Sequence, residues 1–192
     1  MKKIVNVILV LTVCFSMCAC GFSVSTETSS TGQLTTSINN NKVKLNHSEY
    51  EFPEGYSFKD GKIKSPVGMS YVQIYNREDE VVGVCADGYY TETISKDTMK
   101  DAVNTVYKAA HNVDSSLQLT DDLFVEGKNL ILLTISLDDG SAIFIGKLGT
   151  PDFAYITQSK SDKDNIMQDY LEQVVLQLGN QEDYEILFSE DK

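Results

Sequence analysis

The sequence of 192 residues contains no tryptophan, one arginine and three prolines. So few prolines exclude a collagen-like chain, and a hydrophobic share of 42% excludes a disordered acidic tail. The absence of tryptophan removes the commonest platform for binding sugars. Because the lone arginine, Arg77, is followed at once by three acidic residues, the chain also lacks the basic stripe that attracts nucleic acids and anionic lipid surfaces.

Long apolar runs are also scarce, which excludes a polytopic membrane protein. The longest, residues 4–19, is interrupted by three polar residues and is shorter than the roughly 20 residues that a finished transmembrane helix needs. Two lysines precede it, as in the charged and apolar regions of a secretory signal. The sequence therefore predicts a removable signal peptide over residues 1–19.

The end of this signal resembles the lipobox of bacterial lipoproteins. Met17 lies three residues before Cys20, a small alanine directly precedes the cysteine, and Gly21 follows it. The resemblance implies that Cys20 is acylated and becomes the first residue of a mature protein held at the extracytoplasmic face of the cell membrane. An ordinary signal peptide or an uncleaved anchor is the alternative, and both also place the folded part outside the cytoplasm.

Cysteine is nearly absent from the rest of the chain. Cys14 and Cys18 leave with the signal, so Cys85 is the one thiol of the folded part and no intrachain disulfide can form. Within its apolar run we interpret Cys85 as a small buried hydrophobe, with a catalytic nucleophile as the alternative. Loss of two lysines with the signal changes the net charge from −12 to −14, which an anionic envelope surface would repel.

Residues 20–41 are predicted to be a lipidated cysteine followed by a tether. Ten of the residues in 21–41 are serine or threonine, and only one is charged. Such a segment cannot bury enough apolar surface to offset the entropy of ordering it. As a flexible coil of about 20 residues it would reach about 25 Å, which is enough to hold a domain clear of lipid headgroups.

Residues 42–192 carry the patterns of a globular domain. Strands are expected near Val43 and over residues 50–52, 71–75 and 81–86, with a polar hairpin loop at 76–80. Ser95 is a candidate N-cap for a first helix that ends near His111. Its predicted buried stripe consists of Met99, Ala102, Val103, Val106 and Ala110.

A four-strand meander is predicted after this helix, because glycine-rich turns separate four apolar runs. The runs are residues 117–126, 130–137, 142–148 and 153–157. Ser161 with Asp164 is then expected to form a capping box for a second helix that Gly179 ends. Its apolar stripe consists of Met167, Tyr170, Leu171, Val174 and Leu178, and residues 184–188 are expected to add an edge strand.

Strands grouped in this way, and not alternating with helices, predict an α+β fold: an antiparallel meander sheet with two amphipathic helices packed on it. The element order over residues 51–178, with the entry segment 52–58, resembles the PsbP-like fold. That family consists mostly of small, non-catalytic accessory proteins that act on protein assemblies. The resemblance therefore implies binding rather than chemistry.

Motifs of catalytic or phosphate chemistry are missing. The sequence has no phosphate-binding P-loop, no Gly-x-Ser-x-Gly elbow and no His-Glu-x-x-His. The two histidines, His47 and His111, lie at predicted element boundaries, and a dyad of a histidine with Cys85 is the alternative to a structural role. Four acidic clusters are interpreted as solvated turns and caps, with surface calcium as the alternative: Glu78-Asp79-Glu80, Asp121-Asp122, Asp138-Asp139 and Asp162-Lys163-Asp164-Asn165.

These observations predict a non-catalytic, membrane-anchored lipoprotein whose extracytoplasmic domain binds a protein partner, with no cofactor and no nucleic acid. A hydrolase, or a small-ligand or cation binder, that uses carboxylates is the alternative. Cys20 is the one site residue predicted by name, as the lipidation site. Tyr89 and Tyr90 are candidates for an exposed contact patch.

Overall fold

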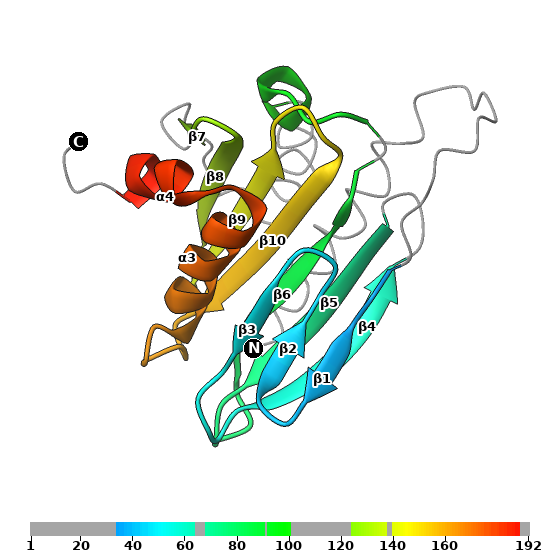
Figure 1. Ribbon diagram of the computed structural model, residues 1–192. Coiled ribbons are helices and arrows are strands. Elements are labelled where there is room, and N and C mark those ends of the chain that lie inside the picture. Colours follow the sequence, from blue (N-terminus) through cyan, green and yellow to red (C-terminus); the bar gives the residue numbers. More distant parts are fainter. Residues whose placement is uncertain (1–33, 64–67, 91, 101–123, 138–139, 189–192) are drawn as a thin grey trace, which may run out of the picture.

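The computed structural model describes residues 34–63, 68–90, 92–100, 124–137 and 140–188. Its strands and named helices, in chain order, are β1 (Ser37–Asn39), β2 (Lys42–Lys44), β3 (Glu49–Glu51), β4 (Ser57–Ile63), β5 (Gly68–Tyr75), β6 (Val81–Tyr89), β7 (Phe124–Glu126), β8 (Leu130–Leu137), β9 (Gly140–Lys147), β10 (Asp152–Ser159), α3 (Ile166–Leu178) and α4 (Gln181–Phe188) (Figure 1). Another helix begins at Lys96 and is described as far as Lys100. None of the helices in these ranges is long and apolar enough to cross a membrane.

Seven strands form the larger sheet in the order β4-β5-β6-β10-β9-β8-β7, and every neighbouring pair is antiparallel. The chain follows β4 to β6 and then β7 to β10 as two meanders, which join where β10 pairs with β6. Strands β1 to β3 form a separate antiparallel sheet. The predicted α+β class with an antiparallel meander sheet and helices packed on it is confirmed.

One face of the larger sheet is covered by α3 and by the three-stranded sheet, which lie side by side in Figure 1. Strand β5 alternates, so that Val72 and Ile74 point into this layer and are fully buried. Phe52, which follows β3, packs there against Tyr170 of α3. Burying such a side chain stabilises the fold by about 1.5–3 kcal/mol.

The opposite face carries a second apolar cluster, formed by the alternate residues of several of the same strands. Ile131 and Leu133 of β8 and Phe144 of β9 are buried there, together with Met99 from the helix that begins at Lys96. Burial of Met99 agrees with the predicted first stripe. The other members of that stripe, Ala102, Val103, Val106 and Ala110, lie outside the described residues, as do His111 and residues 117–123 of the first predicted meander strand.

The second predicted helix is present, and its apolar stripe is buried as expected. Its predicted capping box is wrong. The helix begins at Ile166, one turn later than that box requires, and Asp162 accepts hydrogen bonds from the N–H groups of Ile166 and Met167. Gly179 ends the helix, as predicted.

The expected edge strand at residues 184–188 is also wrong, because this segment belongs to the helix α4. Tyr184, Leu187 and Phe188 follow the i, i+3, i+4 spacing and pack against the main core on one side. Asn180 accepts the N–H of Asp183 at the start of the helix. The segment 184–188 therefore forms a helix that begins after the polar cap Asn180, and its apolar side is partly buried against the core.

Candidate functional site

Three loops meet at one end of the larger sheet. They are the β3–β4 loop, the β5–β6 hairpin turn and the loop from β10 to α3, and all three lie at the lower end of the molecule in Figure 1. Strand pairing brings them together, because Ser57 lies opposite Tyr75 and Gln158 lies opposite Gly83. Between the loops is a cleft of about 470 Å³, lined by Pro53, Glu54, Gly55, Tyr56, Asn76, Arg77, Glu78, Ser161, Lys163, Asp164 and Ile166.

The hairpin turn that presents Arg77 to this cleft is ordered by Asn76. The side-chain oxygen of Asn76 accepts the N–H groups of Glu78 at 3.1 Å and of Glu80 at 2.9 Å. Asp79 adopts a positive φ of 60°, which asparagine and aspartate tolerate better than most residues. This agrees with the polar hairpin loop predicted at residues 76–80, and it fixes Arg77 and Glu78 at the tip.

The Arg77 side chain lies against the backbone of the β3–β4 loop. Its Nη2 donates a hydrogen bond to the carbonyl oxygen of Glu54 at 3.3 Å. Gly55 has a φ of +99°, and a Cβ atom at this position would overlap Nε of Arg77. Glycine is therefore needed at position 55 both for the backbone conformation and for the space that the guanidinium occupies.

The other side of the cleft comes from the loop before α3. Tyr56 donates a hydrogen bond from its hydroxyl to Asp164 at 3.1 Å, which joins the two loops. Burial, and then the neighbouring Asp164 carboxylate, raises the pKa of Tyr56 to about 12, so the phenol stays protonated and keeps donating. Lys163 is exposed beside this pair.

The cleft combines both signs of charge. Arg77 and Lys163 supply two cations, and neither forms an ion pair with a carboxylate anywhere in the part of the chain that the structure describes. Glu54, Glu78 and Asp164 supply carboxylates. Among the described residues, no group of three or more histidine, cysteine, aspartate or glutamate side chains is placed to hold a metal ion. The arrangement is suited to binding a polar, charged surface.

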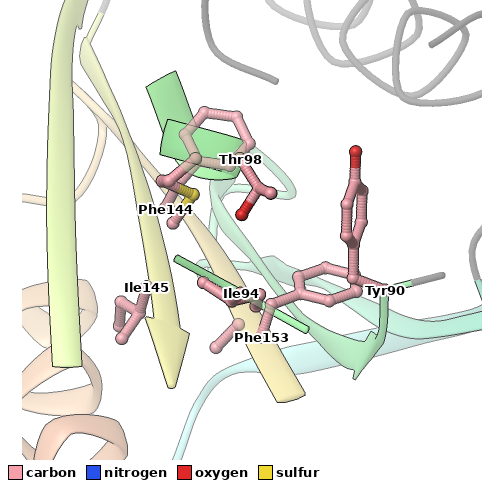
Figure 2. Close-up of a pocket in the computed structure, with 8 residues that line it drawn as sticks. Tyr90, Ile94, Thr98, Phe144, Ile145 and Phe153 are labelled. Carbon is pink, nitrogen blue, oxygen red and sulfur yellow. The ribbon is translucent and has the colours of Figure 1, made fainter. Parts of the chain in front are cut away.

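A second cavity lies in the apolar layer on the opposite face of the sheet (Figure 2). Tyr90, Ile94, Thr98, Phe144, Ile145 and Phe153 are labelled in Figure 2 among the residues that line it. Its volume is about 20 Å³, which is room for about one water molecule. Among the described residues, such a volume is a packing gap in the core.

A buried polar network fastens the N-terminal segment to the sheet. Asp87 of β6 is fully buried, and its carboxylate accepts the N–H groups of Asn46 at 2.8 Å and His47 at 2.9 Å. The Ser48 hydroxyl also donates to Asp87, at 2.9 Å, and it shares a hydrogen bond with the Tyr170 hydroxyl of α3. None of the residues of this network lines the cleft, and the network's effect is structural.

The structure does not bring His47 to Cys85, and His111, the other histidine considered for a dyad with Cys85, lies outside the described residues. His47 contacts the backbone oxygen of Gly88, the carboxylate of Asp152 and the ring of Tyr89. Among the described residues, no contact joins His47 to Cys85. Cys85 is a fully buried free thiol, and burial raises its pKa well above the ordinary value. It therefore occupies the position of a small buried hydrophobe.

The acidic clusters have mixed outcomes. Glu78-Asp79-Glu80 forms the hairpin turn, with Glu78 in the cleft, and Asp162 caps α3 while Asp164 lines the cleft. Asp121-Asp122 and Asp138-Asp139 lie outside the described residues. Tyr89 and Tyr90 are only half-buried, but Tyr89 packs on His47 and Tyr90 lines the small apolar cavity, so they do not form a joint patch.

Sequence reasoning did not find the cleft. The one feature of the sequence that points to the cleft is Arg77, the single arginine of an acidic chain, which lies in a predicted turn. Its acidic neighbours argue against nucleic-acid binding but do not indicate a cleft. Gly55 and Lys163 carry no local pattern that links them to Arg77.

In the comparisons with known proteins, no family model matches the chain, and no curated protein or solved structure is significantly similar to it.

Proposed function

We propose that this chain is a bacterial lipoprotein, anchored to the cell membrane through Cys20, whose non-catalytic extracytoplasmic domain binds a protein partner in the cleft between the three loops. The signal-like segment over residues 1–19 and the lipobox pattern from Met17 to Gly21 support the anchor. The resemblance to the PsbP-like fold supports a role in binding to a protein assembly.

The position of the cleft relative to Leu34, where the described chain begins, is the observation that carries this proposal. The described chain begins at Leu34, whose side chain lies against Gly68 at the start of β5. The cleft lies at the other end of the same strand, beside the turn that follows Tyr75. Eight residues of strand separate the two ends by about 25 Å. A partner can therefore reach the cleft without meeting the residues at which the described chain begins.

The content of the cleft favours a protein surface as its occupant. Side chains of both signs line it, together with exposed Pro53 and half-buried Tyr56 and Ser161. Interfaces that form and dissociate are about as polar as the rest of a protein surface and carry charged rims. The mixture of charges is complementary to another mixed surface.

A hydrolase or a small-ligand or cation binder remains the alternative, because three carboxylates line the same cleft. Glycoside hydrolysis would need two of them facing each other across a sugar ring. In the structure, Asp164 is engaged by the Tyr56 hydroxyl, and Arg77 and Lys163 lie in the same cleft. These contacts favour recognition over acid and base catalysis.

The proposal is tested by filling the cleft. After chemical crosslinking in the native cell and identification of the captured protein, Ser161→Trp is compared with Glu185→Trp. Ser161 lines the cleft, whereas Glu185 is exposed on α4, at the opposite end of the molecule. We expect Ser161→Trp to lower the yield of the partner about tenfold and Glu185→Trp to leave it unchanged.

Thermal melts of both variants establish that they are folded. An equal yield of partner from both variants would show that the cleft is not the binding surface. Turnover of a glycoside or peptide by the purified domain, lost on replacing Glu54 or Glu78, would favour the hydrolase alternative.

A further inference from the structure

We propose that the partner places an aspartate or glutamate side chain against Arg77, so that its carboxylate pairs with the guanidinium in the cleft. This inference rests on the proposed function, because it names the chemistry by which the same cleft takes its partner. It assigns Arg77 as the residue that recognises the partner and Gly55 as the residue that positions Arg77.

The Arg77 side chain is exposed and lies against the β3–β4 loop, which orients its guanidinium before a partner arrives. Within the described ranges, Arg77 makes one hydrogen bond, to the backbone oxygen of Glu54, and its side chain lies over Gly55 where no Cβ is present. A guanidinium has five N–H donors, so this bond leaves most of them for a ligand. A side chain held in this way loses little conformational entropy when the ligand binds.

The charge balance of the whole chain makes Arg77 distinctive. It is the one arginine in a sequence of net charge −12, and no carboxylate of the described residues forms an ion pair with it. A planar guanidinium matches a carboxylate through two parallel hydrogen bonds, which a lysine cannot reproduce. An arginine that has no carboxylate of its own in the described structure is therefore suited to one from a partner.

The surrounding carboxylates select the kind of anion. Glu54, Glu78 and Asp164 lie in the same cleft and would repel a phosphate, which carries nearly two negative charges, more strongly than a carboxylate, which carries one. A partner surface that carries one carboxylate beside cations can pair the carboxylate with Arg77 and the cations with the acidic residues of the cleft. The free carboxylate of a chain end would pair with Arg77 but would leave Lys163 and the acidic residues unmatched.

The test places a photoreactive residue at position 78 of the full-length lipoprotein in the native cell and maps the crosslinked segment of the partner. We expect that segment to contain an aspartate or glutamate. Arg77→Glu should lower the crosslinking yield about tenfold, and Arg77→Lys, which keeps the charge but not the planar fork, should lower it less. Lys128→Glu is the control, because Lys128 is exposed and lies in the β7–β8 turn at the opposite end.

A charge exchange decides the question. Replacing the crosslinked acidic residue of the partner with arginine should restore the yield with Arg77→Glu, which no loss of folding could mimic. Gly55→Ala, which displaces the guanidinium without changing its charge, should lower the yield in the same direction as Arg77→Glu. Thermal melts verify that each variant is folded, and Arg77→Gln replaces Arg77→Glu should the reversal lower the melting temperature.

The failures are distinguishable. If Arg77→Glu keeps the full yield while Ser161→Trp loses it, the carboxylate contact is wrong and the proposed binding surface stands. If the adduct maps to the partner's terminal carboxylate and the charge exchange restores nothing, the assignment to an acidic side chain is overturned. If position 78 yields no protein adduct at all, the proposed function fails and the inference fails with it.

Discussion

At the scale of single residues, two buried carboxylates hold separate parts of the described fold together. Asp87 fastens the segment before β3 to the middle of the larger sheet, and Asp183 fastens α4 to the turn between β7 and β8. Both are fully buried, and both accept several hydrogen bonds from backbone and side-chain donors. Neither was expected from the sequence, because each bonds residues at least 39 positions away.

Replacing Asp87 should be among the most damaging single changes. Asp87→Ala leaves the partly buried N–H groups of Asn46 and His47 and the buried hydroxyl of Ser48 without this acceptor, and a fully buried donor left unpaired costs about 1–3 kcal/mol. We expect the free energy of unfolding in urea titrations to fall by about 3–5 kcal/mol. Asp60→Ala, at an exposed position of β4, is the matched control, expected within about 0.5 kcal/mol of the wild type. Similar, small losses from both changes would show that the Asp87 network does not support the fold.

The lowered pKa of Asp183 makes the stability of the fold depend on pH. Burial alone would raise its pKa, but hydrogen bonds from Asn129, Leu130 and Lys128 outweigh burial and leave the pKa below its ordinary value. Because the folded pKa lies below the unfolded one, the carboxylate stabilises the fold above the unfolded pKa of about 4. That contribution is lost as the pH falls through the folded value.

We therefore expect Asp183→Asn to unfold at lower urea than the wild type at pH 7. The difference between the two proteins should shrink as the pH is lowered below about 4. Urea midpoints measured across this range check it. A difference that stays constant with pH would contradict the role of the charge.

At the scale of elements, the residue that caps the start of α3 differs from the one that the sequence pattern predicts. The pattern Ser-x-x-Asp pointed to Ser161, whereas the structure shows that Asp162 accepts the two first N–H groups of the helix. Asp162→Ala should lower stability by about 1 kcal/mol, as the loss of a cap usually does. Ser161→Ala, at the neighbouring position, should leave the urea midpoint unchanged. A larger loss of stability from Ser161→Ala than from Asp162→Ala would show that Ser161 caps the helix after all.

Strands and helices differed in how far local pattern predicted them. Residues 130–137 were predicted with the bounds that β8 has, because they form an apolar run between turn residues. Strand β4 was missed, since its sequence Ser-Phe-Lys-Asp-Gly-Lys-Ile is that of an exposed edge with three charges and a glycine. Residues 184–188 gave the wrong element, because five residues are too few to separate a strand from a helix by periodicity.

The cleft could not be predicted from local pattern at all. Gly55, Arg77 and Lys163 come from loops far apart in the sequence, and only the strand order brings them to one end of the sheet. That order depends on the pairing of β10 with β6, a contact between strands about 70 residues apart. Sequence periodicity predicts which face of a strand is buried, but it does not predict which strand lies next to it.

At the scale of the whole molecule, the proposal combines a lipid anchor at Cys20 with a binding surface in the cleft. Cys20→Ala should remove acylation and so release the protein from the membrane fraction, because the acidic domain has no attraction to an anionic surface. Fractionation of cells that express the wild type and Cys20→Ala measures this. A Cys20→Ala protein that is cleaved elsewhere and still sediments with membranes would show that the lipobox interpretation is wrong.

The most direct test of the central claim compares two photoreactive positions in the full-length chain, expressed in its native cell. Position 78 lies in the cleft, and position 185 lies on α4 at the opposite end. The account predicts that position 78 forms a discrete adduct with one protein, at least about tenfold more abundant than any adduct from position 185. Equal adducts from both positions, or a discrete adduct from position 185 alone, would contradict the account.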